Sequence, residues 1–319
     1  MVIIAEENII KIKPIPFFKK YFELIIFISF LILCLVCIFV FKMPLLIPTK
    51  GQAKFFSIHY VYPLIIAVIC QFILIFFYKL FKRKNAGISL RENLISLLYI
   101  PFIALVMFMH FQIKAWTPLV NPNTYDAFYQ KTDMLTPIAG WLSALGKVLD
   151  TAGIFSSLYF WLFFLTFALS FVLHSAFDHF RNFRKVVVGT CLILLLGGIS
   201  YWIAPALGPF IYESSKLAGF PETQNGMYVM YQSIITTGKI PDAYFGASLA
   251  AMPSLHIANS LFLLLCARRS LKWLLIFYIP VFIFFVIVAV ASKYHYVIDL
   301  VFGALLSFYI YWIVNKICD

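Results

Sequence analysis

The stretch LKWLLIFYIPVFIFFVIVAVA, residues 271–291, decides the fold class of this chain. It is apolar over about the 20 residues that a helix needs to cross a ~30 Å hydrocarbon core. Similar runs recur along the chain, which is 63% hydrophobic and 12% charged and has a mean hydropathy of +0.95. Each run must be helical, because a strand in lipid would leave backbone groups unpaired. The sequence therefore predicts an all-α, polytopic transmembrane helical bundle and excludes a soluble fold.

Eight spans are predicted from these runs, at 21–41, 58–78, 93–113, 154–177, 186–204, 249–267, 271–291 and 294–314. The first span follows a basic stretch that is also typical of a signal peptide. Its apolar run, however, is long and ends in FKMP (41–44) without a small-residue cleavage site. We therefore expect a retained helix.

The positions of Lys and Arg predict the orientation. With a cytoplasmic N-terminus, 16 of the 25 Lys and Arg fall on the inside, where the loops are short, and the nine on the outside are all Lys. We therefore expect an integral protein of a plasma, inner or endomembrane, with both termini cytoplasmic. The formal net charge of +12 is then explained by the excess of Lys and Arg on the inner side and by attraction to anionic lipid headgroups. Nucleic-acid binding has no support.

Two long connections, 114–153 and 205–248, lie on the outer side in this orientation. The first contains an amphipathic stretch that suits the membrane interface, and the second has too many aromatic residues for plain disorder. Residues 1–92 are interpreted as an N-terminal basic segment with two accessory transmembrane helices, and 93–319 as a catalytic membrane domain that includes both outer loops.

The stretch AMPSLHIANS, residues 251–260, places a histidine at the outer start of the sixth span. Ser254 is a candidate N-cap that follows Pro253. The free N–H groups of the first helical turn, with the helix dipole behind them, favour an anion. His256 is therefore well placed to meet a phosphate on the outer face.

The stretch KYHYVIDLVFG, residues 293–303, begins the eighth span with His295 and Asp299. Their i, i+4 spacing predicts one helix face, where Asp299 accepts a hydrogen bond from one imidazole nitrogen and fixes the tautomer. An ionisable residue just inside a span is costly unless it is paired or functional. Since the sixth and eighth spans both run inward, His256 and His295 should meet at the depth of a lipid headgroup.

This set of residues suits phosphoryl transfer through a covalent phosphohistidine. His295 would attack phosphorus, Asp299 would orient it, and His256 would protonate the leaving oxygen. Zinc binding by the two histidines and Asp299 is chemically allowed, as is haem ligation by the histidines. HxxxD is not a specific metal signature, and haem would leave Asp299 unexplained. We therefore expect no metal and no cofactor.

PSLH followed by HYVID resembles the two histidine motifs of the type 2 phosphatidic acid phosphatase superfamily, in the branch of the inositol phosphorylceramide synthases. YWIAP (201–205) with Gly208 and Pro209 is similar to that branch's first motif, and 114–126 resembles its outer segment. The resemblance implies that His295 is the nucleophile, Asp299 its relay carboxylate and His256 the acid. The substrate-binding residues expected beside them are Ser254, Lys293, Tyr294, Gly208, Pro209, Lys114 and Asp126.

The chain departs from the phosphatases of this superfamily at two cations. They carry KxxxxxxRP in the first motif and an arginine six residues before the nucleophilic histidine, whereas here Gly208 precedes Pro209 and Ala289 stands at the second position. Losing arginines removes bidentate phosphate clamps, and lysine is not an equivalent substitute. The nearest cation in the third motif is Lys293.

The predicted function is a membrane phosphotransferase that acts on lipid phosphate headgroups. It would move a phosphodiester or phosphoinositol-type group to a lipid acceptor, as in sphingolipid metabolism, or to a polar acceptor, at the outer or lumenal face. One alternative is a lipid phosphate or polyprenyl pyrophosphate phosphatase, and another is a non-catalytic lipid transporter or scaffold. The expected partners are the lipid substrates and the bilayer. No oligomeric state follows from the sequence.

Overall fold

The computed structural model describes residues 19, 21–51, 62–81, 90–149, 155–212, 220–246 and 248–318. Within these residues every regular element is a helix, which confirms the all-α prediction. The elements are α2 (Phe22–Phe39), α4 (Tyr62–Phe81), α5 (Leu90–Ala115), α6 (Thr117–Val120), α7 (Asp126–Met134), α8 (Ile138–Leu149), α9 (Phe155–Phe177), α10 (Phe180–Ile203), η2 (Pro209–Tyr212), α11 (Phe220–Thr237), η3 (Asp242–Tyr244), α12 (Leu255–Ser270), η4 (Lys272–Leu274), α13 (Leu275–Ala291) and α14 (Val297–Cys318).

Six of the described helical segments are long and apolar enough to cross a membrane. They are Phe22–Phe39, Ile95–Ala115, Leu158–Phe177, Phe180–Ile203, Lys272–Ala291 and Val297–Cys318. The chain is therefore an integral membrane protein, while the predicted number of eight spans is not confirmed. The other two predicted spans correspond to α4 and α12. Helix α12 has 16 residues, because the chain before Leu255 is extended rather than helical, so its ~24 Å length is short for a span.

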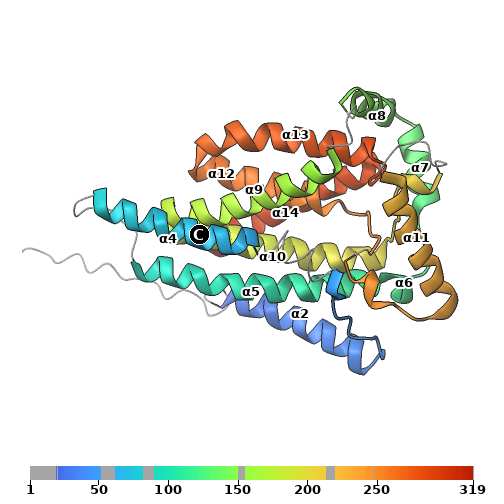
Figure 1. The fold of residues 1–319 in the computed structure, drawn as a ribbon, viewed down its shortest axis with the longest axis horizontal. Helices are drawn as coiled ribbons and strands as arrows, with labels where there is room; N and C mark the ends of the chain where they lie inside the picture. The colour runs from blue at the N-terminus through green and yellow to red at the C-terminus, as the bar shows by residue number, and fades with distance from the viewer. Residues whose placement is uncertain are drawn as a thin grey trace, which may run out of the picture.

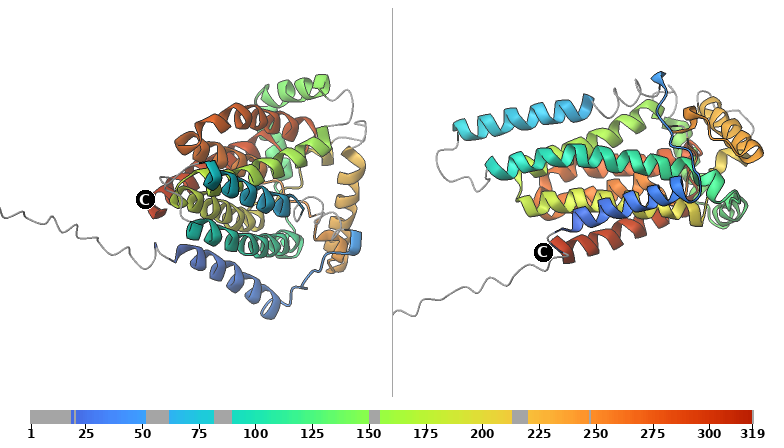
Figure 2. Two further views of the ribbon diagram at one scale, coloured as in Figure 1. Left: turned by 60° about the vertical axis from the view of Figure 1, so that its left-hand side comes forward. Right: turned by 90° about the horizontal axis from the view of Figure 1, so that it is seen from below.

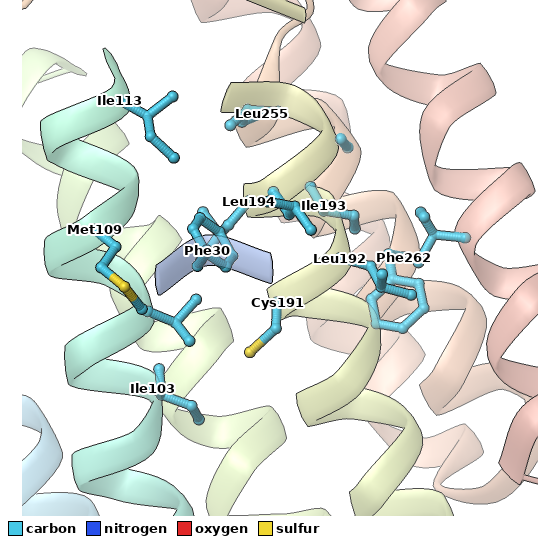
Figure 3. Close-up of a cluster of buried hydrophobic side chains, with 14 of the residues drawn as sticks. Phe30, Ile103, Met109, Ile113, Cys191, Leu192, Ile193, Leu194, Leu255 and Phe262 are labelled. Carbon is cyan, nitrogen blue, oxygen red and sulfur yellow. The ribbon is translucent and has the colours of Figure 1, made fainter. Parts of the chain in front are cut away.

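Helix α10 lies at the centre of the bundle and packs against α2, α5, α9, α12 and α14. Figure 3 shows the apolar cluster between α5, α10 and α12, with Ile103 and Met109 on one side and Phe262 on the other. Phe30 of α2 belongs to the same cluster, so an N-terminal helix packs directly on this core. The predicted domain division at residue 92 stays a prediction.

The two ends of the bundle differ in character (Figures 1 and 2). The short helices α6, α7, α8 and α11 gather at one end, and the C-terminus lies at the other. The end with the C-terminus is basic: Arg184 pairs with Glu23, and Asn315 accepts hydrogen bonds from Lys185 and Arg269, each 2.9 Å long. The two predicted outer connections therefore share one end, opposite the basic residues of α10 and α12.

Helices α7 and α8 carry the amphipathic pattern predicted for the first connection. Large apolar side chains along them are exposed, among them Met134, Leu135, Trp141 and Val148. Exposed apolar residues on short helices at a bundle end suit the interface between water and hydrocarbon. This end of the protein is therefore suited to contact with lipid headgroups.

Candidate functional site

His295 and Asp299 meet at the start of α14. Asp299 is fully buried, and its Oδ2 lies 3.4 Å from His295 Nδ1 and accepts a 2.9 Å hydrogen bond from the Tyr296 N–H. The contact to His295 is longer than the usual ~2.9 Å. Because Nδ1 faces the carboxylate, Nε2 is the nitrogen left to react.

The geometry of this pair differs from the sequence-based expectation. The i, i+4 spacing predicted two residues on one helix face, but α14 begins at Val297 and His295 lies before it. The contact forms because the chain bends just before α14, so that the His295 side chain reaches Asp299 in the first helical turn. The neighbouring Tyr296 N–H therefore binds the same carboxylate oxygen.

A second carboxylate holds the start of α14 from another helix. Asp133 of α7 accepts the Val297 N–H through both oxygens, at 3.0 and 3.1 Å, and so places a negative charge at the positive end of the helix dipole. Burial raises the pKa of Asp133, and the nearby Asp299 adds to the increase, while backbone N–H donors oppose it. The backbone at His295 is thus anchored to both α7 and α14.

His256 stands in the first turn of α12, facing aromatic rings of α9. Its ring centroid lies 4.5 Å from that of Phe163 and 4.7 Å from that of Tyr159. It is only partly buried and close enough to His295 for an electrostatic interaction. The structure therefore brings the two predicted histidines together at one end of the bundle.

Ser254 occupies the N-cap position of α12 without capping it through its side chain. Its backbone N–H donates to the Asp299 carbonyl at 3.1 Å, which joins α12 to α14. Its buried hydroxyl has no hydrogen-bond partner among the described residues, and the same is true of Asp299 Oδ1. No side chain at the N-cap accepts a hydrogen bond from the first-turn N–H groups of α12. These N–H groups are therefore available as hydrogen-bond donors to an anion.

Gly208 and Pro209 lie against the segment that carries His295. Gly208 has a φ of +117°, and a Cβ there would come within 2.7 Å of the Tyr294 carbonyl oxygen, so only glycine fits. Pro209 is buried, and the following Phe210 donates its N–H to the Lys293 carbonyl at 3.3 Å. The first and third motifs are thus packed together through their backbones.

Asp126 is buried, and three donors of the protein form hydrogen bonds with its carboxylate. We name this set of hydrogen bonds the Asp126 clamp. Its carboxylate accepts the N–H of Leu207 at 3.0 Å and of Gly208 at 2.9 Å, and the Tyr296 hydroxyl at 2.9 Å. These hydrogen bonds give Asp126 an internal role, while the predicted substrate contact stays a prediction. Asp126 ties α7, the Gly208 segment and the residue next to His295 to one another.

Removing the Asp126 clamp should destabilise the site and the fold. Asp126→Ala leaves three buried donors without their charged acceptor, and we expect the free energy of unfolding to fall by about 3 kcal/mol, with lipid turnover lost in parallel. Thermal unfolding in detergent measures the first effect and a turnover assay the second. Asp242→Asn, at an exposed carboxylate of the same end, is the matched control. An unchanged melting temperature of Asp126→Ala would contradict the clamp.

Lys293 and Tyr294 turn the chain between α13 and α14. Lys293 has a φ of +58°, and its Nζ donates to Ser143 Oγ of α8 at 3.4 Å. The Tyr294 ring stacks on Tyr159, with centroids 6.2 Å apart and planes 13° apart. Burial raises the pKa of Tyr294 to about 12, so its phenol stays protonated.

Lys114 lies in the last turn of α5, at the same end of the bundle. Its Nζ lies 5.9 Å from the centroid of the Tyr201 ring and within electrostatic range of His256. Neither Tyr159 nor Tyr201 is predicted as a site residue from the sequence: no motif marks Tyr159, and Tyr201 begins the YWIAP motif without an assigned role.

The described part of the chain contains no cluster of side chains that suits a metal ion. There, no group of three or more His, Cys, Asp or Glu side chains is arranged to hold a metal ion. The two histidines and Asp299 instead form a hydrogen-bonded pair and a separate imidazole among aromatic rings.

Comparison with known proteins agrees with this geometry. A model of the PAP2 superfamily matches residues 132–313, a segment that includes His256, His295 and Asp299. No curated protein and no solved structure matches the chain. Because the matched segment covers more than half of the sequence and contains both histidine motifs, this integral membrane protein belongs to the PAP2 superfamily.

Proposed function

We propose that this protein is a phosphotransferase that moves a phosphodiester-type headgroup from a phospholipid to a lipid or polar acceptor, through phospho-His295. Membership of the PAP2 superfamily supports an enzyme that acts on lipid phosphates. The observation that carries the chemistry is the contact of Asp299 with His295 Nδ1, beside His256. A carboxylate on one imidazole nitrogen makes the other nitrogen a better nucleophile.

The reaction would proceed in two displacements. His295 Nε2 attacks phosphorus and forms the P–N bond, while the P–O bond to the diacylglycerol oxygen breaks and that oxygen takes a proton from His256. In the second step the acceptor hydroxyl loses its proton to His256, and its oxygen displaces His295 from phosphorus. Asp299 stabilises the imidazolium character of His295 in both steps.

Transfer is preferred to hydrolysis because of the cations at the site. The arginines of the described helices are Arg91, at the start of α5, and Arg181, Arg184, Arg268 and Arg269 of α10 and α12, and they lie toward the basic end of the bundle. A site without arginine forks is a poor match for a doubly charged phosphomonoester. The similarity to inositol phosphorylceramide synthases, noted for PSLH and HYVID, points to the same class of reaction.

The proposed orientation places the histidines at the extracytoplasmic or lumenal face. The basic residues around Arg184, Lys185 and Arg269 lie at the opposite end, which the positive-inside rule assigns to the cytoplasm. The substrate would then be a lipid of the outer leaflet, and the exposed apolar residues of α7 and α8 would lie at its headgroups.

A product assay decides between the candidate functions. Purified protein is incubated with phosphatidylinositol labelled in its phosphate, with and without ceramide or a diacylglycerol whose chains differ in length from those of the donor, and the products are separated by thin-layer chromatography. A new labelled phospholipid, absent with His256→Ala, is the expected result. Acceptor-independent release of free phosphate or inositol phosphate would replace the proposal by a hydrolase, the second candidate that the superfamily supports. No product from any lipid would favour transport or scaffolding.

A further inference from the structure

Helix α5 reaches the candidate site although it precedes the segment that matches the superfamily. Its last turn is fixed to the end of α10, because the Trp202 indole N–H donates to the Ile113 carbonyl at 2.8 Å. Lys114 follows Ile113 directly, and its ammonium lies over the buried Tyr201 ring. The position of this cation is therefore set by backbone contacts between two spans.

Two adjacent glycines of α10 bring three helices together at this level. A Cβ on Gly197 would lie 2.3 Å from Leu255 of α12, and one on Gly198 would lie 3.1 Å from Ile113 of α5. Figure 3 shows Ile113 and Leu255 at the same end of the apolar cluster. Since these are the chain neighbours of Lys114 and His256, the cation and the imidazole flank the same end of α10.

The ammonium of Lys114 lacks a negatively charged partner among the described residues. It is partly buried at the end of a membrane span, and no carboxylate of the described residues pairs with it. The ammonium lies 5.9 Å from the centroid of the Tyr201 ring, and the imidazoles of His110 and His256 are within electrostatic range. An ammonium in such surroundings is costly unless an anion joins it.

Tyr159 offers a second unused donor beside His256. Its side chain is 2% exposed, and its hydroxyl has no hydrogen-bond partner in the described part of the chain. The ring lies 4.7 Å from His256 and stacks on Tyr294, which fixes where the hydroxyl can point. A buried hydroxyl without a partner destabilises the protein, so a ligand acceptor is the expected complement.

We propose that Lys114 and Tyr159 bind the non-bridging oxygens of the phosphate attacked by His295, and that this pair selects a singly charged phosphodiester over a phosphomonoester. The inference rests on the proposed function. A phosphodiester has one negative charge, which one ammonium balances, whereas a phosphomonoester has nearly two. The Tyr159 hydroxyl adds a neutral donor. The cation thus comes from α5, outside the matched segment 132–313.

Binding without turnover tests the pair separately from the reaction. The His295→Ala protein in detergent is titrated with fluorescent phosphatidylinositol and with fluorescent phosphatidic acid of the same chains. Lys114→Met and Tyr159→Phe are added singly to that background, and Lys131→Met, at an exposed lysine of α7, is the matched control. Both substitutions keep most of the side chain, and size-exclusion profiles verify that the variants remain folded.

The expected result is a weaker affinity for phosphatidylinositol by roughly tenfold or more in Lys114→Met and by roughly fivefold in Tyr159→Phe, as for lost hydrogen bonds to a charged group. Lys131→Met should bind as its parent does, and phosphatidic acid should bind more weakly than phosphatidylinositol. Unchanged affinity in both variants, or tighter binding of phosphatidic acid, would overturn the inference. Lys114-dependent binding in a protein without transfer activity would instead uphold the inference and refute the proposed function.

Discussion

His295→Ala is expected to abolish lipid turnover while the protein remains folded. The imidazole supplies the nitrogen that would bond to phosphorus, so its loss should lower the rate by at least about 10⁴-fold, as for other covalent nucleophiles. The fold should survive because the bonds that anchor this segment come from neighbouring groups, namely the Tyr296 and Val297 N–H. The assay is headgroup transfer from labelled phospholipid.

A trapped intermediate makes this test specific. The wild-type protein, quenched during turnover with lipid labelled in its phosphate, should carry label on one histidine, in a phosphoramidate bond that acid cleaves and base does not. His295→Ala should carry none. His179→Ala, at an exposed histidine of the opposite end, should label as the wild type does. Label retained by His295→Ala would assign the nucleophile to another residue.

Asp299→Asn is expected to lower the rate by roughly 10³–10⁴-fold, as for other carboxylate–histidine pairs. The amide cannot stabilise an imidazolium, and it presents an N–H where His295 Nδ1 needs an acceptor. Because Asn keeps the shape of Asp, the affinity of His295→Ala protein for phosphatidylinositol should change little when Asp299→Asn is added. The effect should therefore lie in kcat.

The chain contains a natural control for this prediction. His174 and Asp178 also stand at i and i+4, with His174 Nδ1 only 2.8 Å from Asp178 Oδ2, but they lie near the basic end of the bundle. Asp178→Asn should leave the transfer rate near that of the wild type. Equal losses in the two variants would mean that both pairs act through stability, and Asp299 would then have no special place in the mechanism.

These two pairs show what sequence reasoning could resolve. Spacing alone is the same in HSAFD (174–178) and HYVID (295–299), so it cannot separate a structural pair from a candidate catalytic one. The sequence-based prediction separates the two pairs by position, because it places His295 at the start of one predicted inward-running span and His256 at the start of another. The hydropathy pattern that defines the spans therefore carried the identification of the candidate site, together with the histidine motifs.

The helix boundaries at the site could not be predicted with the same success. The span 271–291 agrees closely with Lys272–Ala291, since its hydropathy is uniform. Helices α12 and α14 begin later than predicted, at Leu255 and Val297, because apolar residues before them form turns and extended backbone. Hydropathy does not distinguish an apolar turn from an apolar helix.

Side-chain roles that depend on distant segments were also beyond the sequence. Asp126 was expected to contact substrate, yet its acceptors are taken by backbone groups at 207 and 208 and by Tyr296. Tyr159 had no motif, and its importance follows only from its unpaired hydroxyl beside His256. Residues that contact one another at the site are separated by long stretches of chain, so a local sequence pattern cannot predict these contacts.

The Asp126 clamp joins groups that are synthesised far apart in time. Its carboxylate is made first, its backbone partners follow 81 and 82 residues later, and Tyr296 follows after 170. A nascent chain that extends past Asp126 but ends before Leu207 therefore contains the Asp126 carboxylate but none of its three donors. The clamp is complete only once Tyr296 has been made, and no translation intermediate that ends before Asp299 contains all three candidate reactive groups, His256, His295 and Asp299.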